Sequence, residues 1–268
     1  MVDLYAWNPR RPVMRGPLGR LIPLRRPVNN FGDLLGPQLV ERMLASRGLR
    51  MDQGAKNVRL FSIGSVMHEV GNADHVWGSG VNGKEVARDY TVSGAQFHAV
   101  RGHLTKAFLD ERGGSVPEVY GDPGILTARY FPAANLGRPL FQSDYTIVPN
   151  LHDYRSMAGA PNVLNPRAPL LECLATIATS RFVVGSSLHG LVVAESYGVP
   201  ARRMVSSAEP DFKYDDYYSG TGRRPQQAAF SVEEALDLGA PDSPEGDHER
   251  LISSFPWHLW GTDQASGS

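Results

Sequence analysis

The sequence predicts an α/β protein built on parallel β-sheets with helices on both faces. Short apolar runs, rich in β-branched and aromatic residues, alternate with helical segments along most of the chain. Many of these runs end in Gly or Ser directly before a helix, and ligands bind at such carboxyl ends of strands in open α/β sheets. A Pro- and Gly-rich stretch, 131–143, interrupts the alternation, and we take it as the boundary between two domains.

The first predicted domain covers residues 1–132. Its strands are expected at 2–7, 58–63, 75–77 and 97–100, and its helices at 34–46 and 102–112. Between the first strand and the first helix, residues 8–27 contain five prolines and no usable period. We predict a long basic loop there, of the kind that is usually functional or disordered.

The second predicted domain covers residues 133–245. Its strands are expected at 145–148, 181–184 and 201–205, and its helices at 168–178, 188–197 and 232–238. The remaining segment, 246–268, has a helix at 247–256, an aromatic cluster around Trp257 and Trp260, and a frayed tail. We predict that this C-terminal helix returns to the first domain.

The composition excludes several classes of protein. The net charge is −1, so nothing global indicates nucleic-acid binding. Cys173 is the single cysteine, which rules out an intrachain disulfide and a cysteine zinc cluster and fits a reducing compartment. We see no signal peptide, and no apolar run reaches the roughly 18 residues of a membrane-spanning helix. We therefore expect a cytoplasmic protein.

The charge is unevenly spread. Residues 1–30 hold six arginines against Asp3, and residues 232–268 hold eight acidic residues against Arg250. The basic segment, 9–26, is a candidate for peripheral contact with an anionic membrane surface. The alternative is that both segments are simply solvated faces.

Several segments, taken in order, resemble the polysaccharide pyruvyltransferase family. They are Asn30–Asp33, Ile63–Ser65, Val76–Gly80, Val100–Thr105, Tyr120–Gly124, Ile147–Pro149, Val184–Gly190 and Lys213–Tyr218. The resemblance implies two Rossmann-like domains facing a cleft, as in nucleotide-sugar glycosyltransferases of the B type. It also implies transfer of the enolpyruvyl unit of phosphoenolpyruvate to hydroxyls of a sugar or lipid-linked oligosaccharide as a ketal, without a cofactor. The sequence around His189 is similar to the branch that acts on bacterial exopolysaccharides.

Such a reaction needs groups that hold an anion, an acid that protonates the donor, and a base for the sugar hydroxyl. His189 is the first candidate, because it opens a helix at the end of a strand, where an anion is favoured and imidazole can carry a proton. Ser186, the expected N-cap, and Ser187 offer hydroxyls to phosphate. Some family members carry an arginine at the position of Ser187, and Lys213 is the candidate replacement for that charge.

Further candidates follow other strand ends. Arg101 is expected to grip a carboxylate bidentately, and Asp33 to act as base for the acceptor or as a helix N-cap, with Asn30 binding sugar beside it. The remaining candidates for substrate binding are Gly64, Ser65, Ser79, His152 and Tyr217. Tyr214, Tyr217 and Tyr218 have the spacing of a core helix face as the alternative. The histidines show no metal-ligand spacing, so we expect no catalytic metal.

Two other functions remain open. A glycosyltransferase would use a nucleotide sugar on the same frame, but no acidic pair is placed to bind a ribose in the second domain. A non-catalytic carbohydrate-binding relative is permitted by Ser187 in place of arginine.

Overall fold

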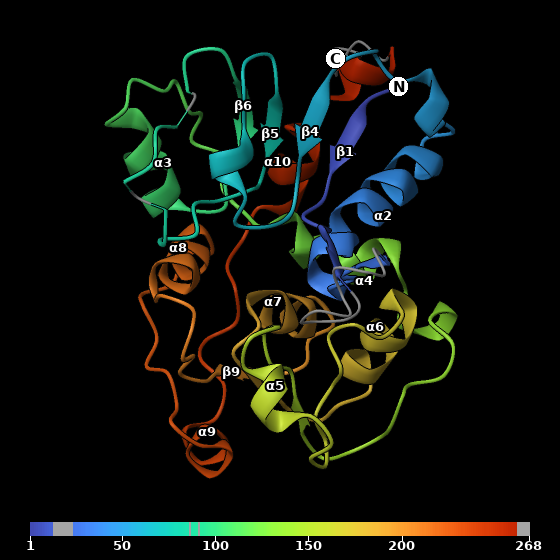
Figure 1. Ribbon diagram of the computed structural model, residues 1–268, viewed down its shortest axis with the longest axis vertical. Coiled ribbons are helices and arrows are strands. Elements are labelled where there is room, and N and C mark those ends of the chain that lie inside the picture. Colours follow the sequence, from blue (N-terminus) through green and yellow to red (C-terminus); the bar gives the residue numbers. More distant parts are fainter. Residues whose placement is uncertain (13–23, 86, 91, 262–268) are drawn as a thin grey trace.

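Two parallel β-sheets form the centre of the protein (Figure 1). The computed structural model describes residues 1–12, 24–85, 87–90 and 92–261. The first sheet has the order β1-β4-β5-β6, with β1 Asp3–Tyr5, β4 Arg59–Phe61, β5 His75–Trp77 and β6 Gln96–Ala99. The second has the order β7-β8-β9, with β7 Thr146–Ile147, β8 Val183–Gly185 and β9 Ala201–Arg203. The predicted α/β class with parallel sheets is confirmed.

Helices follow the strands closely, as the alternating pattern predicts. The longer ones are α2 Phe31–Ser46, α3 His103–Asp110, α6 Leu170–Ala178, α7 Leu188–Ser196, α8 Phe212–Gly220, α9 Val232–Leu238 and α10 His248–Ser253. Single turns are α4 Thr127–Tyr130 and α5 Tyr154–Met157, and the 3-10 turns are Met51–Gln53, Met67–Glu69, Pro123–Leu126, Ala133–Asn135 and Trp257–Trp260. Leu60 of β4, the buried face of α2 and Val183 of β8 belong to one hydrophobic cluster, so both sheets share packing.

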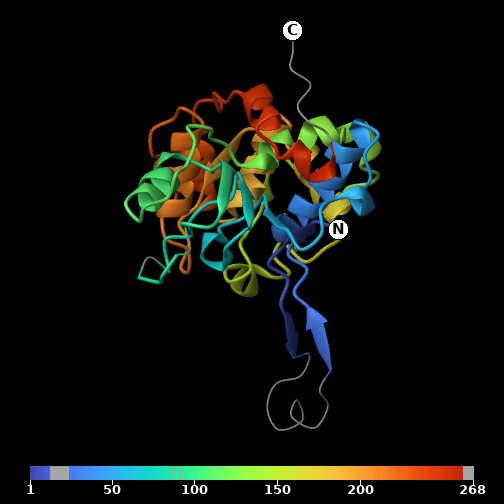
Figure 2. The ribbon, with the colours of Figure 1, turned by 90° about the horizontal axis from the view of Figure 1, so that it is seen from above.

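The predicted loop 8–27 is wrong at both of its ends. There, β2 (Arg10–Pro12) and β3 (Arg25–Pro27) pair as an antiparallel ribbon that projects from the body (Figure 2). Pro12 lies opposite Arg25 and Pro27 opposite Arg10. A two-stranded ribbon has only edge strands, where a proline without an N–H group is tolerated, and this is why the proline content was misleading. Residues 13–23 of the predicted basic segment lie outside the described residues.

Helix α8 shows which alternative holds for the tyrosine cluster. Tyr214, Tyr217 and Tyr218 are all buried on one face of this helix, with at most 2% of each exposed. The spacing therefore reflects a core helix face.

The C-terminal segment packs against the first sheet. Trp77 of β5 donates from Nε1 to the carbonyl oxygen of Leu251 at 2.8 Å, and Phe255 meets the Trp77 ring edge-on with centroids 4.9 Å apart. The amide of Ala55 donates to the carbonyl of Leu259 at 2.8 Å. The domain boundaries near 132 and 245 stay predictions.

We expect Phe255→Ala to lower the free energy of unfolding by about 3–5 kcal/mol, because the ring is almost fully buried against three tryptophans. Urea denaturation measures this change. The matched control is Phe230→Ala, whose ring is 77% exposed and should change stability by less than about 0.5 kcal/mol. Equal stability of the two variants would contradict the packing of the C-terminal segment.

Candidate functional site

A cleft of about 260 Å³ lies where the carboxyl ends of the two sheets face each other. Trp7, Ser65 and Lys84 follow β1, β4 and β5, and His152, Ser187 and Lys213 follow β7, β8 and β9. The cleft is lined by Trp7, Asn30, Asp33, Ser65, Val66, His68, Asn82, Lys84, Asn150, Leu151, His152, Ser187, Leu188, His189, Glu209 and Lys213. Parallel strands bring their ends to one edge of a sheet, which explains how residues far apart in sequence meet here.

Asp33 lies at the N-terminal end of α2. The helix begins at Phe31 with Asn30 as its N-cap, so the expected N-cap role of Asp33 is wrong. Asn30 instead donates from Nδ2 to Oδ2 of Asp33 at 2.7 Å. Burial raises the pKa of Asp33 to about 6, and this outweighs the hydrogen bond from Asn30, which lowers it. Asp33 can therefore exchange a proton near neutral pH.

His189 is the second residue of α7, on the opposite wall of the cleft. Its ring packs over Gly32, where an added Cβ would lie 2.4 Å from Nδ1, so only glycine fits beneath it. Burial, together with the Lys213 and Arg101 cations, lowers the pKa of His189 to about 3. The imidazole is thus neutral, and its buried Nε2 has no hydrogen-bond partner among the described residues.

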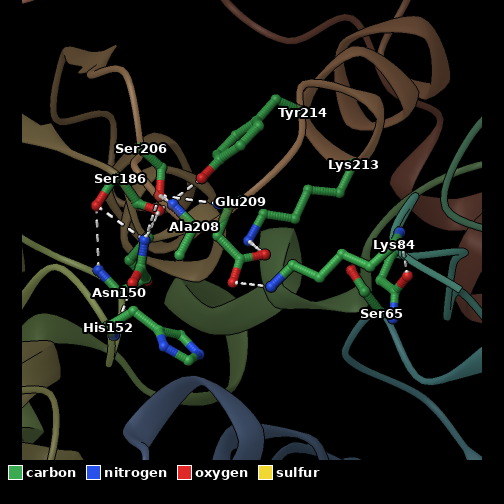
Figure 3. A network of polar contacts seen from close by, with 12 residues as sticks. Ser65, Lys84, Asn150, His152, Ser186, Ser206, Ala208, Glu209, Lys213 and Tyr214 are labelled. Carbon is green, nitrogen blue, oxygen red and sulfur yellow. Dashed lines mark hydrogen bonds and ion pairs between the residues drawn. The ribbon is translucent and has the colours of Figure 1, made fainter.

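Two lysines converge on Glu209 from different sides of the cleft (Figure 3). Lys84 follows β5 and donates to Oε1 at 2.6 Å, while Lys213 in α8 donates to Oε2 at 2.8 Å. Burial lowers the pKa of Lys213, whereas Glu209 opposes that shift. Burial alone would raise the pKa of Glu209, but the two lysines hold it below its usual value. The cleft therefore contains two cations held by one internal carboxylate.

Sequence reasoning missed Lys84 and Glu209. Glu209 precedes Lys213 by four residues, a spacing at which charged side chains pair on a helix, and this signal was available. Lys84 lies beyond the Gly78–Gly80 turn in an irregular segment, and no local pattern distinguishes it from other lysines.

A polar network fixes the strand ends that carry the second wall. Asn150 after β7 donates from Nδ2 to Asp153 at 2.7 Å. It also donates to Ser206 at 2.9 Å, and Tyr214 donates to the carbonyl of Ser186 at 2.6 Å (Figure 3). The N-cap of α7 is Ser187, whose Oγ accepts from the amide of Gly190 at 3.2 Å. The predicted N-cap, Ser186, is therefore wrong by one residue.

The model of the polysaccharide pyruvyl transferase family matches residues 66–207, just over half of the chain. The chain belongs to this family. No curated protein matches it. A solved structure of an uncharacterized protein from Klebsiella pneumoniae subsp. pneumoniae is 10% identical and aligns over 70% of this chain and 83% of that chain. The TM-score of this alignment is 0.44.

In this polysaccharide pyruvyl transferase, Arg101 does not line the cleft. Its side chain is fully buried and pairs through Nε with Asp216 at 2.9 Å. Its other nitrogens donate to Ser65 Oγ and to the carbonyl of Val81, both at 2.6 Å. The arginine does grip a carboxylate, but that carboxylate is the protein's own.

Four other expected contacts, Tyr217, Ser79, Gly64 and Ser186, also lie outside the cleft lining. Tyr217 is buried and donates to Oε2 of Glu195 at 2.6 Å. Ser79 is buried and donates to the carbonyl of Gly64 at 2.8 Å, in a turn where Gly64 has a φ of 118°. Gly64 and Ser79 thus shape the turn that places Ser65 in the cleft.

Within the described ranges, no group of three or more His, Cys, Asp or Glu residues is placed to hold a metal ion. Across those same residues, no helix combines the length and apolar character needed to cross a membrane.

We expect Arg101→Met to lower the free energy of unfolding by about 3–5 kcal/mol, because it leaves Asp216 as an uncompensated buried charge. Thermal and urea melts measure the loss. A variant with normal stability and a selectively weakened donor affinity would contradict this structural role and restore the predicted binding role.

Asp33→Asn should stabilise the protein at high pH and leave it nearly unchanged at pH 4. The carboxyl of Asp33 has a pKa of about 6 in the folded protein and 3.8 in the unfolded chain. The wild type therefore loses stability relative to the variant as pH rises from 3.8 to about 6. The full difference, reached above pH 7, is at most about 3 kcal/mol. Urea melts from pH 4 to pH 8 test it, with the exposed Asp144→Asn as control. A pH-independent difference would show that Asp33 is not shifted.

Proposed function

We propose that this protein transfers the enolpyruvyl group of phosphoenolpyruvate to sugar hydroxyls of an exopolysaccharide or its lipid-linked precursor, forming a pyruvate ketal and releasing phosphate. Membership in the polysaccharide pyruvyl transferase family supports the reaction class. The observation that carries the proposal is that one cleft is lined by two lysines and by two groups of shifted pKa, Asp33 and His189. A cytoplasmic location, where phosphoenolpyruvate is made, belongs to the same proposal.

In this proposal, the two sheets are the cores of two Rossmann-like domains in a B-type glycosyltransferase arrangement. The acceptor occupies the side of residues 1–132, near Asn30 and Asp33, and the donor occupies the side of residues 133–245. The placement of the cleft at the carboxyl ends of both sheets supports this reading.

The donor is an anion with a phosphate and a carboxylate, and the cleft offers it Lys84, Lys213 and the N-terminus of α7. Glu209 is ion-paired with both lysines in the free protein. A donor phosphate displaces Glu209 from these two lysines. Lys213 then supplies the positive charge that Ser187 lacks.

Donor binding also sets the protonation of His189. Its pKa is low in the free protein because it is buried near cations. An added negative charge about 4 Å away, at an effective dielectric constant of about 20, favours the protonated imidazole by roughly 4 kcal/mol. Two such charges exceed the roughly 5 kcal/mol needed to move a pKa from 3 to 7. Donor binding thus allows His189 to be protonated and to act as an acid. Asp33, ionised above about pH 6, serves as base.

Ketal formation balances in protons and bonds with His189 as acid and Asp33 as base. His189 gives a proton to the methylene carbon of the donor, which becomes a methyl group and leaves C2 electrophilic. Asp33 takes the proton of the first sugar hydroxyl as its oxygen bonds to C2. The C2–O bond to phosphate then breaks, a second sugar hydroxyl closes the ketal, and its proton leaves with the phosphate. Two hydroxyl protons are lost in total, which balances the proton on carbon and the one on phosphate. Proton exchange with solvent then returns Asp33 to its ionised form and His189 to its protonated form.

His189→Ala should lower turnover by about 10²–10⁴-fold, the usual contribution of a general acid–base group. His189→Asn keeps a hydrogen bond but cannot protonate carbon, so donor affinity should recover more than rate. Phosphate release from phosphoenolpyruvate with oligosaccharide acceptors measures turnover, and thermal melts report folding. The control is His248→Ala, an exposed histidine outside the cleft lining.

Three outcomes would overturn parts of the proposal. Near-wild-type turnover in His189→Ala would remove the catalytic role. A collapsed melt with lost activity would make His189 an anchor of α7. Release of a nucleoside diphosphate from a nucleotide sugar, with none of phosphate from phosphoenolpyruvate, would replace the reaction by glycosyl transfer.

A further inference from the structure

A second cleft, of about 380 Å³, lies between the projecting ribbon and the second wall of the site. Arg11 of β2 and Arg26 of β3 lie directly opposite each other in the ribbon and line its first side. Arg155 of α5 and Arg167, in the loop before α6, line its other side. The remaining lining residues are Pro12, Pro27, Val28 and Asn29, so the described lining includes no carboxylate.

Within the part of the chain that the structure describes, no acidic side chain pairs with this concentration of positive charge. Four guanidinium groups from four separate segments share one recess, and none forms an ion pair with a described residue. Arginines elsewhere in the described chain do pair, as in Arg59 with Asp74 and Arg223 with Glu195. Like charges in one recess repel each other, and the repulsion is relieved when an anion binds between them. Guanidinium groups are also suited to gripping phosphate oxygens bidentately.

We call this second cleft the arginine cleft and the cleft of the candidate site the donor cleft. Three links join them. Trp7 lines the donor cleft, and the Cζ of Arg11 lies 5.7 Å from its ring centroid. Asn29 lines the arginine cleft, while the adjacent Asn30 lines the donor cleft, and Asn29 is fixed by hydrogen bonds to Asn8. The amide of Arg155 donates to the carbonyl of His152, which lines the donor cleft, at 3.3 Å. The two clefts are therefore neighbouring parts of one surface.

We infer that the arginine cleft binds a diphosphate group, carried by the sugar acceptor. The acceptor part of this inference rests on the proposed function. A diphosphate presents two phosphoryl groups, one for each pair of guanidinium groups across the cleft, whereas orthophosphate engages fewer of them. The concave arrangement, with arginines facing from opposite sides, suits a discrete anion rather than the flat surface of a bilayer. A diphosphate held here leaves the attached sugars free to extend past Trp7 toward Asp33.

Inorganic pyrophosphate is the probe, titrated calorimetrically into the full-length protein. We expect binding to the wild type that weakens with added salt. Arg155→Ser/Arg167→Ser should raise its Kd at least about tenfold, since charge-assisted hydrogen bonds are lost. Arg11→Ser/Arg26→Ser, on the ribbon side, should do the same. The matched control is Arg138→Ser/Arg224→Ser, which removes two exposed arginines outside both cleft linings and should leave Kd unchanged.

Lys213→Met separates the two clefts, because it should abolish phosphoenolpyruvate binding and keep pyrophosphate binding. Unchanged pyrophosphate affinity in both arginine double variants would overturn the inference, as would its loss in Lys213→Met. Orthophosphate binding as tightly as pyrophosphate would remove the diphosphate assignment. Sedimentation with phosphatidylglycerol vesicles that pyrophosphate does not compete away would assign the arginines to a lipid surface. Failure of phosphoenolpyruvate turnover refutes the proposed reaction and leaves pyrophosphate binding untouched, so the two tests fail separately.

Discussion

The buried ion pair between Arg101 and Asp216 is the contact on which the geometry of the cleft depends. Arg101 follows the last strand of the first sheet, and Asp216 lies in α8, after the last strand of the second. Asp216 also accepts from the amide and the hydroxyl of Thr105, at 2.8 and 2.7 Å, so both of its oxygens are satisfied. A fully paired buried charge of this kind tolerates little rearrangement, because breaking it leaves the partner unsolvated.

Close backbone contact makes this pairing possible. Helices α3 and α8 lie side by side (Figure 1), and an added Cβ at Gly102 would lie 1.8 Å from the carbonyl oxygen of Asp216. An added Cβ at Gly220 would lie 2.0 Å from the carbonyl oxygen of Arg101. The absence of side chains at these two glycines lets the two backbones approach. The same pair fixes Ser65, through Arg101, on one wall and the helix that carries Lys213 on the other.

The sequence was sufficient for the class of fold and for part of the cleft lining, for a limited reason. Strand ends in an α/β protein must meet, so residues such as Asp33, Ser65, His152, His189 and Lys213 were correctly expected near one cleft. Which strand-end residue faces the cleft and which faces the core depends on tertiary partners. Asp216 is 115 residues from Arg101, and no local pattern reveals that it satisfies the guanidinium.

The same reasoning explains why Tyr217 and Ser79 were misjudged. A buried tyrosine and a ligand-binding tyrosine have the same local sequence, and only the position of Glu195 decides between them. The ribbon at residues 10–12 and 25–27 was missed because proline density hides a pairing that has only edge strands.

The charges of the cleft are balanced internally, and this has a consequence for how an anionic substrate enters. Glu209 joins Lys84, from the first wall, to Lys213, from the second, so the free protein already has the two walls bridged by a carboxylate. A ligand that takes both lysines gains only the difference between its own contacts and those of Glu209. Divalent or trivalent phosphate oxyanions offer more charge than one carboxylate, whereas a neutral sugar offers none. On the proposed function, this exchange selects the donor by its charge and leaves Glu209 as an unpaired acid in the loaded cleft.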